Sequence, residues 1–503
     1  IIFLIVVASE VNDTPLLNST TSTGHKSMTK LFKNIFFLLL FSTSLYSSSP
    51  NIKESIVKIY TVSKIPSYTT PWNSTIRRSH GSGSIIAGNR ILTNAHVVAN
   101  ETFIEIKRHG DTKKYEAEVE FISHQADLAL LKLKDETFFE GTHSIEFNGL
   151  PKFEEEVAVY GFPVGGDSLS VSRGIVSRIE HKTYEHSGEI YLSIQIDAAI
   201  NPGSSGGPAI SDGKMVGVVM QQLTRSQSIG YVVPMEIVRH FLEDIADGEY
   251  DGFSHLGITT QTMENEALRD LYNMDNNTTG ILIIDISEKS NVNKKLKVHD
   301  ILLSVDGHDI KNDATVSYTK NKFTSYKYYI DQKQIGDSVK LGVLRNGKKL
   351  EIDVVLNNRV DDNLLVNTIA HDKTPRYLVY GGYVFSPLTR NLLVKNRSTL
   401  LRLREAAMEW ARDEKEEAVI LLKVLASPAN RGDHNYSLWM VDKVDSKEFK
   451  DFAEFIQIIR DFQGKYLVIE NREGVKIAID REKAKELEQV ILDRYDIKNS
   501  IRW

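Results

Sequence analysis

Between about Ile52 and Ile237 the chain is a succession of short apolar runs interrupted by Gly, Pro, Asn and Asp. Examples are SIVKIYTV, RILTNAHVV, LALLKL, VAVYGFP, IYLSIQID and MVGVVMQ. Runs of this length and spacing are typical of β-strands in a sandwich or barrel. The first segment with helical spacing is Pro234–Asp247, where Ile237, Phe241 and Ile245 fall on one face. We expect this helix to close an all-β domain that spans residues 50–248.

A second block, residues 251–357, mixes strands with one helix. The runs GILIIDI, DILLSVDG, VKLGVLRNG and KLEIDVVL predict strands, and a helix is expected around Glu264–Tyr272. The turn Arg345-Asn346-Gly347-Lys348 lies between two alternating runs and predicts a hairpin. The polar stretch Asn357–Asn363 is the next expected linker.

A third block, residues 366–503, again opens with strands and is expected to close with a helix around Lys483–Leu492. The three blocks agree with a prior of about one domain per 150 residues.

Residues 1–49 read as a leader with a signal peptide. The chain begins with Ile, and its first methionine is Met28, so we expect the natural start there. Lys30 and Lys33 precede the apolar run Ile35–Phe41, which small residues follow, as in a secretory signal peptide. The run is shorter than the ~20 residues that a membrane span needs. A periplasmic or secreted protein is therefore predicted; an uncleaved anchor that faces the periplasm is the alternative.

Composition narrows the chemistry. Of 503 residues, 41% are hydrophobic and 25% charged, which is ordinary for globular proteins. The net charge of −6 argues against nucleic acid as the main partner, because phosphate binding needs a basic face. The chain has no cysteine, which excludes disulfides, thiolate metal sites and a cysteine nucleophile. No P-loop motif is present in the sequence, which disfavours an ATP-driven machine.

Three segments supply the parts of a serine protease. They are TNAHVV with His96, the strand start Asp127-Leu-Ala-Leu-Leu, and NPGSSGGP with Ser205. A serine nucleophile needs a base, an acid that orients the base, and backbone N–H groups that stabilise the oxyanion. We assign His96 as base, Asp127 as orienter and Ser205 as nucleophile, with the oxyanion hole at Gly203, Ser204 and Ser205.

These residues also have other interpretations. Each segment alone could be structural, and Gly203-x-Ser205-x-Gly207 also matches the nucleophile elbow of α/β-hydrolases. In those enzymes the serine precedes its acid and histidine, whereas here the order is His, Asp, Ser. His181 and His186 have no third ligand at a convincing spacing, so no metal site and no cofactor are predicted.

Taken together, TNAHVV, the Asp127 strand and QIDAAINPGSSGGPAI resemble the HtrA/Deg family of serine proteases. The resemblance covers the chain after the leader. It implies a mainly β chain with α+β modules: a chymotrypsin-like (trypsin-like) double β-barrel protease followed by two PDZ-like domains. Ser204 stands where this family usually has Asn, and activity is expected to survive this departure.

The resemblance extends to the second and third blocks. Leu256-Gly257-Ile258 is similar to the carboxylate-binding loop of a PDZ domain, and Val298–Gly307 to the PDZ segment G-D-I-I-x-x-x-G, with His299 where Gly is usual. Tyr380–Leu388 and Val475–Asp480 resemble plant-type Deg proteases, whose second, degenerate PDZ-like domain ends the chain.

The resemblance also implies substrates and partners. In chymotrypsin-like proteases the residue six before the nucleophile, here Ala199, lies at the base of the specificity pocket, and Ile200 and Leu223 are expected to line it. Cleavage after small or medium aliphatic residues of unfolded proteins is predicted, with C-terminal peptides bound at the PDZ domain. We expect a homo-oligomer, a trimer or a multiple of one, that acts in protein quality control. The alternative is a chaperone or scaffold with little proteolysis.

Overall fold

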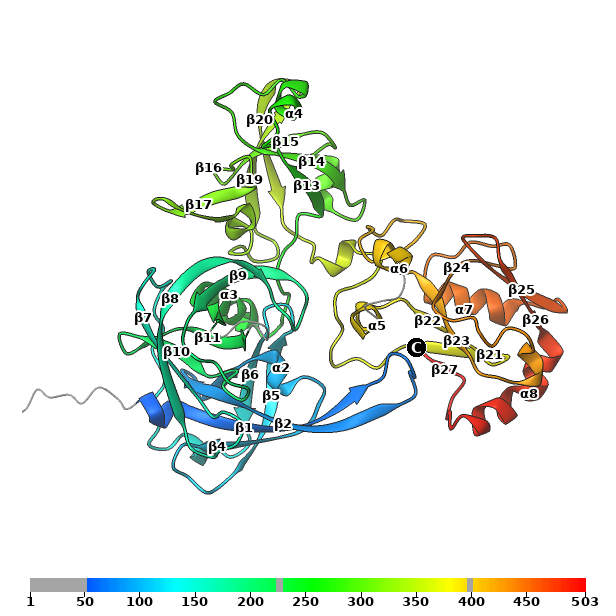
Figure 1. Ribbon diagram of the computed structural model, residues 1–503, viewed down its shortest axis with the longest axis horizontal. Helices are drawn as coiled ribbons and strands as arrows, with labels where there is room; N and C mark the ends of the chain where they lie inside the picture. The colour runs from blue at the N-terminus through cyan, green and yellow to red at the C-terminus, as the bar shows by residue number, and fades with distance from the viewer. Residues whose placement is uncertain (1–51, 223–228, 396–400) are drawn as a thin grey trace, which may run out of the picture. The chain divides into compact units, whose positions relative to one another are not determined.

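The computed structural model describes residues 52–222, 229–395 and 401–503 (Figure 1). The predicted leader, with Met28, lies outside the described residues. Residues Ile52–Trp503 form one compact unit. In the described part of the chain, no helix is both long and apolar enough to cross a membrane.

The protease domain begins with a closed six-stranded barrel, in the strand order β1-β2-β3-β6-β5-β4. Alternating apolar residues of these strands, among them Val57, Ile59 and Ile91, fill its interior. The strands are β1 (Ile56–Pro66), β2 (Ser74–Ile86), β3 (Arg90–Thr93), β4 (Glu101–Arg108), β5 (Tyr115–Ser123) and β6 (Leu128–Leu133). A single turn of helix, α2 (Ala95–Val98), follows β3.

A second closed barrel has the order β10-β11-β12-β9-β8-β7. The predicted helix is present as α3 (Met235–Asp244) and lies against β11 and β12. The strands are β7 (Glu156–Gly161), β8 (Ser170–Thr183), β9 (Ile190–Ile196), β10 (Pro208–Ser211), β11 (Lys214–Gln222) and β12 (Gly230–Pro234).

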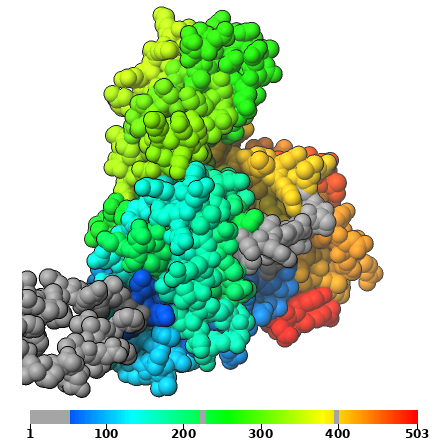
Figure 2. All heavy atoms as spheres, turned by 60° about the vertical axis from the view of Figure 1, so that its left-hand side comes forward, coloured from blue at the N-terminus to red at the C-terminus, as the bar shows by residue number. Residues whose placement is uncertain are grey.

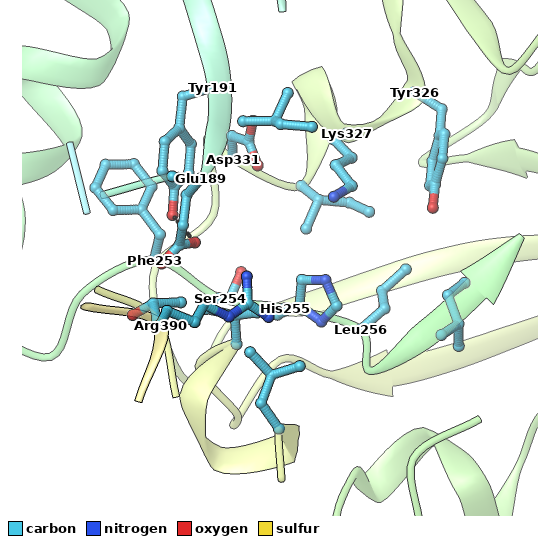
Figure 3. A pocket seen from close by; sticks show the side chains of 17 residues that line it. Glu189, Tyr191, Phe253, Ser254, His255, Leu256, Tyr326, Lys327, Asp331 and Arg390 are labelled. Carbon is cyan, nitrogen blue, oxygen red and sulfur yellow. Dashed lines mark hydrogen bonds between the residues drawn. The ribbon is translucent and has the colours of Figure 1, made fainter. Parts of the chain in front are cut away.

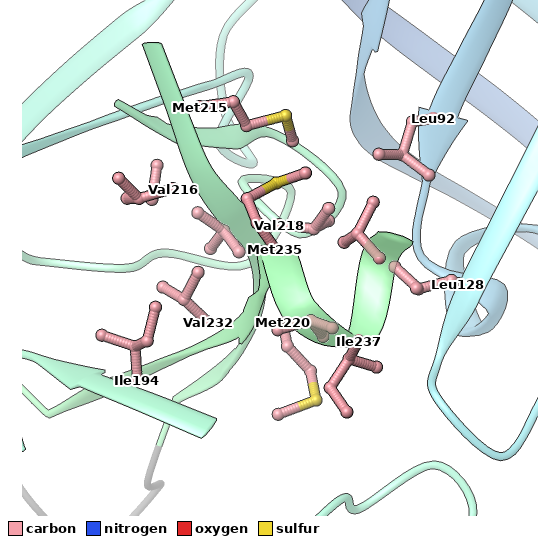
Figure 4. Packing of buried hydrophobic residues seen from close by; sticks show 14 of the residues in the cluster. Leu92, Leu128, Ile194, Met215, Val216, Val218, Met220, Val232, Met235 and Ile237 are labelled. Atoms are coloured by element: carbon pink, nitrogen blue, oxygen red, sulfur yellow. The ribbon is translucent and has the colours of Figure 1, made fainter. Parts of the chain in front are cut away.

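One hydrophobic core joins the two barrels and sets the position of the site. Leu92 of β3 and Leu128 of β6 are fully buried against Met215, Val218 and Met235 from the second barrel (Figure 4). Leu92 lies four residues before His96, and Leu128 directly follows Asp127. The shared core therefore holds both candidate catalytic segments where the barrels meet.

The first PDZ domain is built on a sheet in the order β13-β14-β15-β19-β20, with β16 paired to β15 and a separate β17-β18 hairpin. In the space-filling view its residues, green to yellow-green, form one continuous body (Figure 2). The strands are β13 (Ile258–Thr262), β14 (Ile281–Ile286), β15 (Ile301–Val305), β16 (His308–Asp309), β17 (Thr315–Thr319), β18 (Lys322–Ser325), β19 (Ser338–Arg345) and β20 (Lys348–Val355).

Two local predictions for this domain are confirmed. The expected helix is α4 (Glu266–Leu271), and Asn265 caps its N-terminus. The hairpin turn joins Arg345 to Lys348, with positive φ angles at Asn346 (51°) and Gly347 (74°), as a type I′ turn requires. His299, where glycine was expected, keeps the left-handed conformation with φ 74°.

The second PDZ-like domain contains a seven-stranded sheet in the order β26-β25-β24-β23-β22-β21-β27. The predicted closing helix is α8 (Arg481–Arg494), whereas α5 (Arg390–Lys395), α6 (Leu401–Ala406) and α7 (Phe452–Asp461) were not predicted. The strands are β21 (Tyr377–Tyr380), β22 (Tyr383–Pro387), β23 (Val419–Val424), β24 (Trp439–Val444), β25 (Tyr466–Asn471), β26 (Lys476–Asp480) and β27 (Ile501–Arg502). Single 3₁₀ turns elsewhere are η3 (Ile52–Ser55), η4 (Glu136–Phe139), η5 (Ile245–Asp247), η6 (Asn291–Lys294), η7 (Tyr326–Tyr329), η8 (Asp361–Asn363) and η9 (Pro428–Asn430).

A long hairpin of the protease domain shares the core of this last domain. Strands β1 and β2 stay paired as far as Pro66 and Ser74 and form a long hairpin (Figure 1). Tyr68 lies in the connection between the two strands. Tyr68 is 8% exposed and belongs to the hydrophobic cluster of the second PDZ-like domain. The ring of Trp72 meets that of Tyr377 edge to face at 5.9 Å. The hairpin therefore completes the packing of a domain that is remote in sequence.

Candidate active site

His96 and Asp127 form a double hydrogen bond. Nδ1 of His96 lies 2.7 Å from Oδ2 of Asp127, and the backbone N–H of His96 donates to Oδ1 at 2.9 Å. The Asp127 side chain is 1% exposed, whereas that of His96 is 33% exposed. Asn94 Nδ2 donates to the Asp127 carbonyl at 2.8 Å and fixes the two segments together. The arrangement holds the imidazole with Nδ1 toward the carboxylate and leaves its Nε2 for a substrate or nucleophile.

Their electrostatics suit a base and its orienter. Desolvation lowers the pKa of His96, but the negative charge and hydrogen bond of Asp127 outweigh it, so the pKa lies above its usual value. Desolvation raises the pKa of Asp127, but His96 outweighs it and the net shift is downward. Asp127 thus stays ionised and favours a protonated imidazole, which is the state formed when a base takes a proton.

Ser205 lies on the loop before β10 and is partly exposed. Its carbonyl accepts from the N–H of Ser82 at 2.8 Å, and its hydroxyl donates to the Met220 carbonyl at 3.1 Å. The next residue, Gly206, packs directly on Thr93 and Asn94, which precede His96. The serine loop and the histidine segment are therefore brought together, and the hydroxyl has to turn away from Met220 before it can bond to a base.

The loop around the serine depends on its glycines. Gly203 has φ 97° and Gly206 has φ 84°, conformations that favour glycine. A Cβ at Gly206 would lie 2.1 Å from the Ser82 carbonyl oxygen. The N–H of Ser204 donates to the Asn201 carbonyl at 2.9 Å, so in this conformation it is engaged within the loop. Gly203 and Ser205 remain the predicted oxyanion donors.

Two of the three predicted specificity residues, Ala199 and Ile200, lie within the described part of the chain. Ala199 is exposed, and its carbonyl accepts from the Ser172 hydroxyl at 2.7 Å. Ile200 is 3% exposed and packs against Gly230, where a Cβ would lie only 2.1 Å from it. Leu223 lies outside the described residues.

A cluster of histidines lies beside His96 and was not predicted. The ring of His186, in the loop between β8 and β9, lies 6.2 Å from that of His96 and stacks on His371 at 3.7 Å. His186 Nε2 lies 3.0 Å from His124 Nδ1, and His124 Nε2 lies 2.8 Å from Asp372 Oδ2. Within the described ranges, no group of three or more His, Cys, Asp or Glu residues could hold a metal ion. The cluster connects the linker before the last domain to His96. Its residues lie far apart in the sequence, so no local motif could predict it.

The predicted PDZ loop lines a second candidate site. Leu256 and Ile258 are walls of a cavity of about 190 Å³ next to β13 (Figure 3). Gly257, between them, has φ 66°, and its N–H donates to His255 Nδ1 at 2.9 Å. Burial lowers the pKa of His255 to about 3, so the ring is neutral and its Nδ1 can accept this bond. Glu189 and Arg390, which come from other domains, also line the cavity and were missed, because no local pattern marks them.

Comparison with known families places all three domains. A trypsin-like peptidase domain matches residues 81–218, and PDZ domains match residues 254–356 and 366–501.

Among curated proteins, the chain is 36% identical over 450 residues to putative protease Do-like 3, mitochondrial, of Arabidopsis thaliana, which covers 89% of this chain and 79% of that protein. It is 36% identical over 448 residues to protease Do-like 4, mitochondrial, of the same plant, covering 89% and 84%. A serine protease DegP homolog of Plasmodium falciparum is 30% identical over 510 residues, covering 81% and 58%. Among solved structures, the HtrA-type protease AlgW with a tripeptide covers 62% of this chain and 95% of its own, with a TM-score of 0.49 and 21% identity.

Proposed function

Because this chain belongs to the Do-like (HtrA/Deg) family of serine proteases, we propose that it is an ATP-independent endopeptidase that cleaves unfolded or damaged proteins in protein quality control. The catalytic residues are His96, Asp127 and Ser205. The observation that carries the proposal is the buried carboxylate of Asp127, which is hydrogen bonded to His96 beside the serine loop.

In the reaction, His96 Nε2 takes the hydroxyl proton of Ser205 while the oxygen attacks the peptide carbonyl carbon. Asp127 stabilises the imidazolium that forms, and the N–H groups of Gly203 and Ser205 stabilise the oxyanion. The imidazolium then donates its proton to the leaving amine, and a water molecule releases the acyl group by the same steps. The hydroxyl must first turn away from the Met220 carbonyl before it can bond to His96.

Substrate choice follows from Ala199 and Ile200. No carboxylate stands at position 199, so nothing there would attract Lys or Arg, and small or medium aliphatic residues suit an apolar pocket. An extended strand has to reach the site, which favours unfolded chains. C-terminal peptides bound at the first PDZ domain act as activators, and the chain works as a homo-oligomer. The basic and apolar leader supports a periplasmic or secreted location.

The test is casein digestion by the wild type, Ser205→Ala and Ser204→Ala. We expect cleavage by the wild type and by Ser204→Ala within a few-fold, and a loss of at least about 10³-fold in Ser205→Ala. A map of the products should show cuts after Val, Ala or Ile. Undiminished cleavage by Ser205→Ala overturns the catalytic assignment, and cuts mainly after Arg and Lys overturn the specificity. A wild type that suppresses aggregation without cleavage supports the chaperone alternative.

A further inference from the structure

The cavity beside β13 is a composite of three domains. Its walls include Leu256, Ile258 and Ile330 from the first PDZ domain, Glu189 from the protease domain and Arg390 from helix α5 of the second PDZ-like domain. In Figure 3 the Arg390 side chain extends alongside Ser254 and His255. The charged residues that line it are Glu189, Lys327, Asp331 and Arg390, with His255 beside them.

Three buried polar atoms in this cavity have no hydrogen-bond partner among the described residues: Glu189 Oε1, Ser254 Oγ and Arg390 Nε. Buried polar atoms nearly always have partners in folded proteins, and several orphans in one place indicate an occupant. The cavity, about 190 Å³, is far larger than the space of one water molecule. The occupant has to offer an acceptor to Arg390 and a donor to Glu189 or Ser254, as the end of a peptide does.

Arg390 is held in place without an ion pair to the described residues, although burial lowers its pKa against the opposing charges of Asp361 and Glu189. Its Nη2 donates to the Ala407 carbonyl at 2.9 Å, which fixes the guanidinium. Its Nε has no acceptor among the described residues. Arg390 forms no ion pair within residues 52–222, 229–395 and 401–503. Burial raises the pKa of the neighbouring Glu189 to about 7, so this carboxyl is a weak counter-ion near neutral pH. A guanidinium in this state favours a carboxylate, with which it forms charge-assisted hydrogen bonds.

In the predicted carboxylate-binding loop, Leu256-Gly257-Ile258, one backbone N–H is not available to a ligand. The N–H of Gly257 is already bonded to His255 Nδ1. A carboxylate at this loop would therefore find Arg390 Nε as a free donor on the side where Ser254 and His255 lie. Leu256, Ile258 and Ile330 offer apolar contact to the side chain that precedes the carboxylate.

We propose that Arg390 is a peptide-binding, specificity-determining residue of the first PDZ domain, and that its guanidinium binds the C-terminal carboxylate of a peptide whose last side chain lies on Leu256, Ile258 and Ile330. The proposal rests on the peptide binding proposed above. A peptide bound in this way contacts the second PDZ-like domain through Arg390 and the protease domain through Glu189. It thereby joins all three domains, which a site confined to one PDZ domain cannot do.

The test uses the full chain as Ser205→Ala, so that no peptide is cut. The probe is a fluorescein-labelled octapeptide ending in Leu-Ala-Val, with either a free carboxylate or a terminal amide, and binding is measured by fluorescence anisotropy. Arg390→Gln and Arg390→Lys are compared with Arg494→Gln, which removes an exposed arginine of α8 in the same domain. Thermal unfolding of each variant shows whether it folds.

We expect Arg390→Gln to weaken binding of the free acid by about 10- to 100-fold, because a hydrogen bond to a charged group is worth about 1.5–3 kcal/mol. Binding of the amide should change less than about threefold, Arg390→Lys should recover part of the loss, and Arg494→Gln should match the parent. Equal losses for acid and amide, an unchanged affinity for the acid, or no binding of either peptide by the parent each overturn the proposal. Casein cleavage by the wild type is measured separately, so a failure of the protease assignment is distinguishable.

Discussion

His181 of the protease domain and Asp331 of the first PDZ domain are hydrogen bonded, with Nε2 and Oδ2 separated by 3.1 Å and both side chains less than a tenth exposed. Nδ1 of the same imidazole lies 2.8 Å from the Thr324 hydroxyl. Both ring nitrogens are therefore engaged across the junction of the two domains.

Removing one partner should leave the other buried and unsatisfied. We expect Asp331→Ala to lower the free energy of unfolding by about 1–3 kcal/mol, and His181→Ala to do the same. Because the two residues share one interaction, the double variant should lose less than the sum of the single losses. Urea denaturation of the four proteins measures this. Strictly additive losses would show that the pair contributes no coupling.

The base assignment predicts a pH profile. His96 accepts a proton only when neutral, and Asp127 raises its pKa, so activity should fall as the pH drops through an apparent pKa above 6.5. Asp127→Asn removes the negative charge; it should lower both the rate, by orders of magnitude, and this apparent pKa. The measurement is kcat/KM on a short aliphatic peptide between pH 5 and 9. An unshifted acidic limb in Asp127→Asn would contradict the assignment of His96.

The stacked histidine predicts acid sensitivity. Burial lowers the pKa of His186 to about 3 in the folded protein, whereas the unfolded chain has a value near 6.5. Between these values the unfolded state binds the extra proton, so stability should fall as the pH drops, by at most about 1.4 kcal/mol per pH unit from this group. His186→Phe keeps a ring to stack on His371 and cannot be protonated.

Urea denaturation at pH 7 and pH 5 should show a smaller loss for His186→Phe than for the wild type. The control is His143→Phe, which alters an exposed histidine of the same domain and should leave the pH dependence as it is. If the free energy of unfolding depends on pH in the same way in all three proteins, the pKa of His186 is not lowered in the folded state.

We expect a substitution of His299, which has a left-handed backbone conformation in the first PDZ domain, to stabilise the protein. His299 is exposed, with φ 74°, a conformation that costs a residue with a Cβ about 1–2 kcal/mol. Glycine removes this strain but adds entropy to the unfolded chain. We expect His299→Gly to stabilise the domain by up to about 1 kcal/mol in thermal denaturation, with peptide binding unchanged. A lower Tm would mean that the contact of His299 with Tyr272, whose rings are 5.9 Å apart, outweighs the strain.

The hydrophobic pattern and the turn residues predicted the elements whose local sequence preference agrees with the way they pack in the fold. The strands of both barrels, α3 and the Arg345–Lys348 hairpin are of this kind. Helix α7 was not predicted although Phe452, Phe455, Ile456 and Ile459 have helical spacing, because an apolar pattern over only ten residues does not separate a short helix from a buried strand.

The residues of the candidate sites likewise include some that the sequence predicts and some that it does not. His96, Asp127 and Ser205 were predicted because the three short segments that hold them occur together in the order His, Asp, Ser. Glu189 and Arg390 line a cavity together with residues from another domain, and His371 contacts the carbonyl of His186, 185 residues earlier. No spacing rule within one sequence reports such contacts, because they depend on how whole domains pack.

Tyr68 also has a consequence for the order in which the chain folds during synthesis. Its hydroxyl donates to the carbonyl of Ala370, 302 residues later, and its ring packs into a core that later residues supply. A ribosome that adds about 5–20 residues per second needs roughly 15–60 seconds to reach that point. From the completion of the protease domain near residue 248 until that point, the hairpin tip with Tyr68 and Trp72 is apolar surface that the last domain does not yet cover. The nascent chain is then itself an unfinished protein of the kind that we propose this enzyme to degrade.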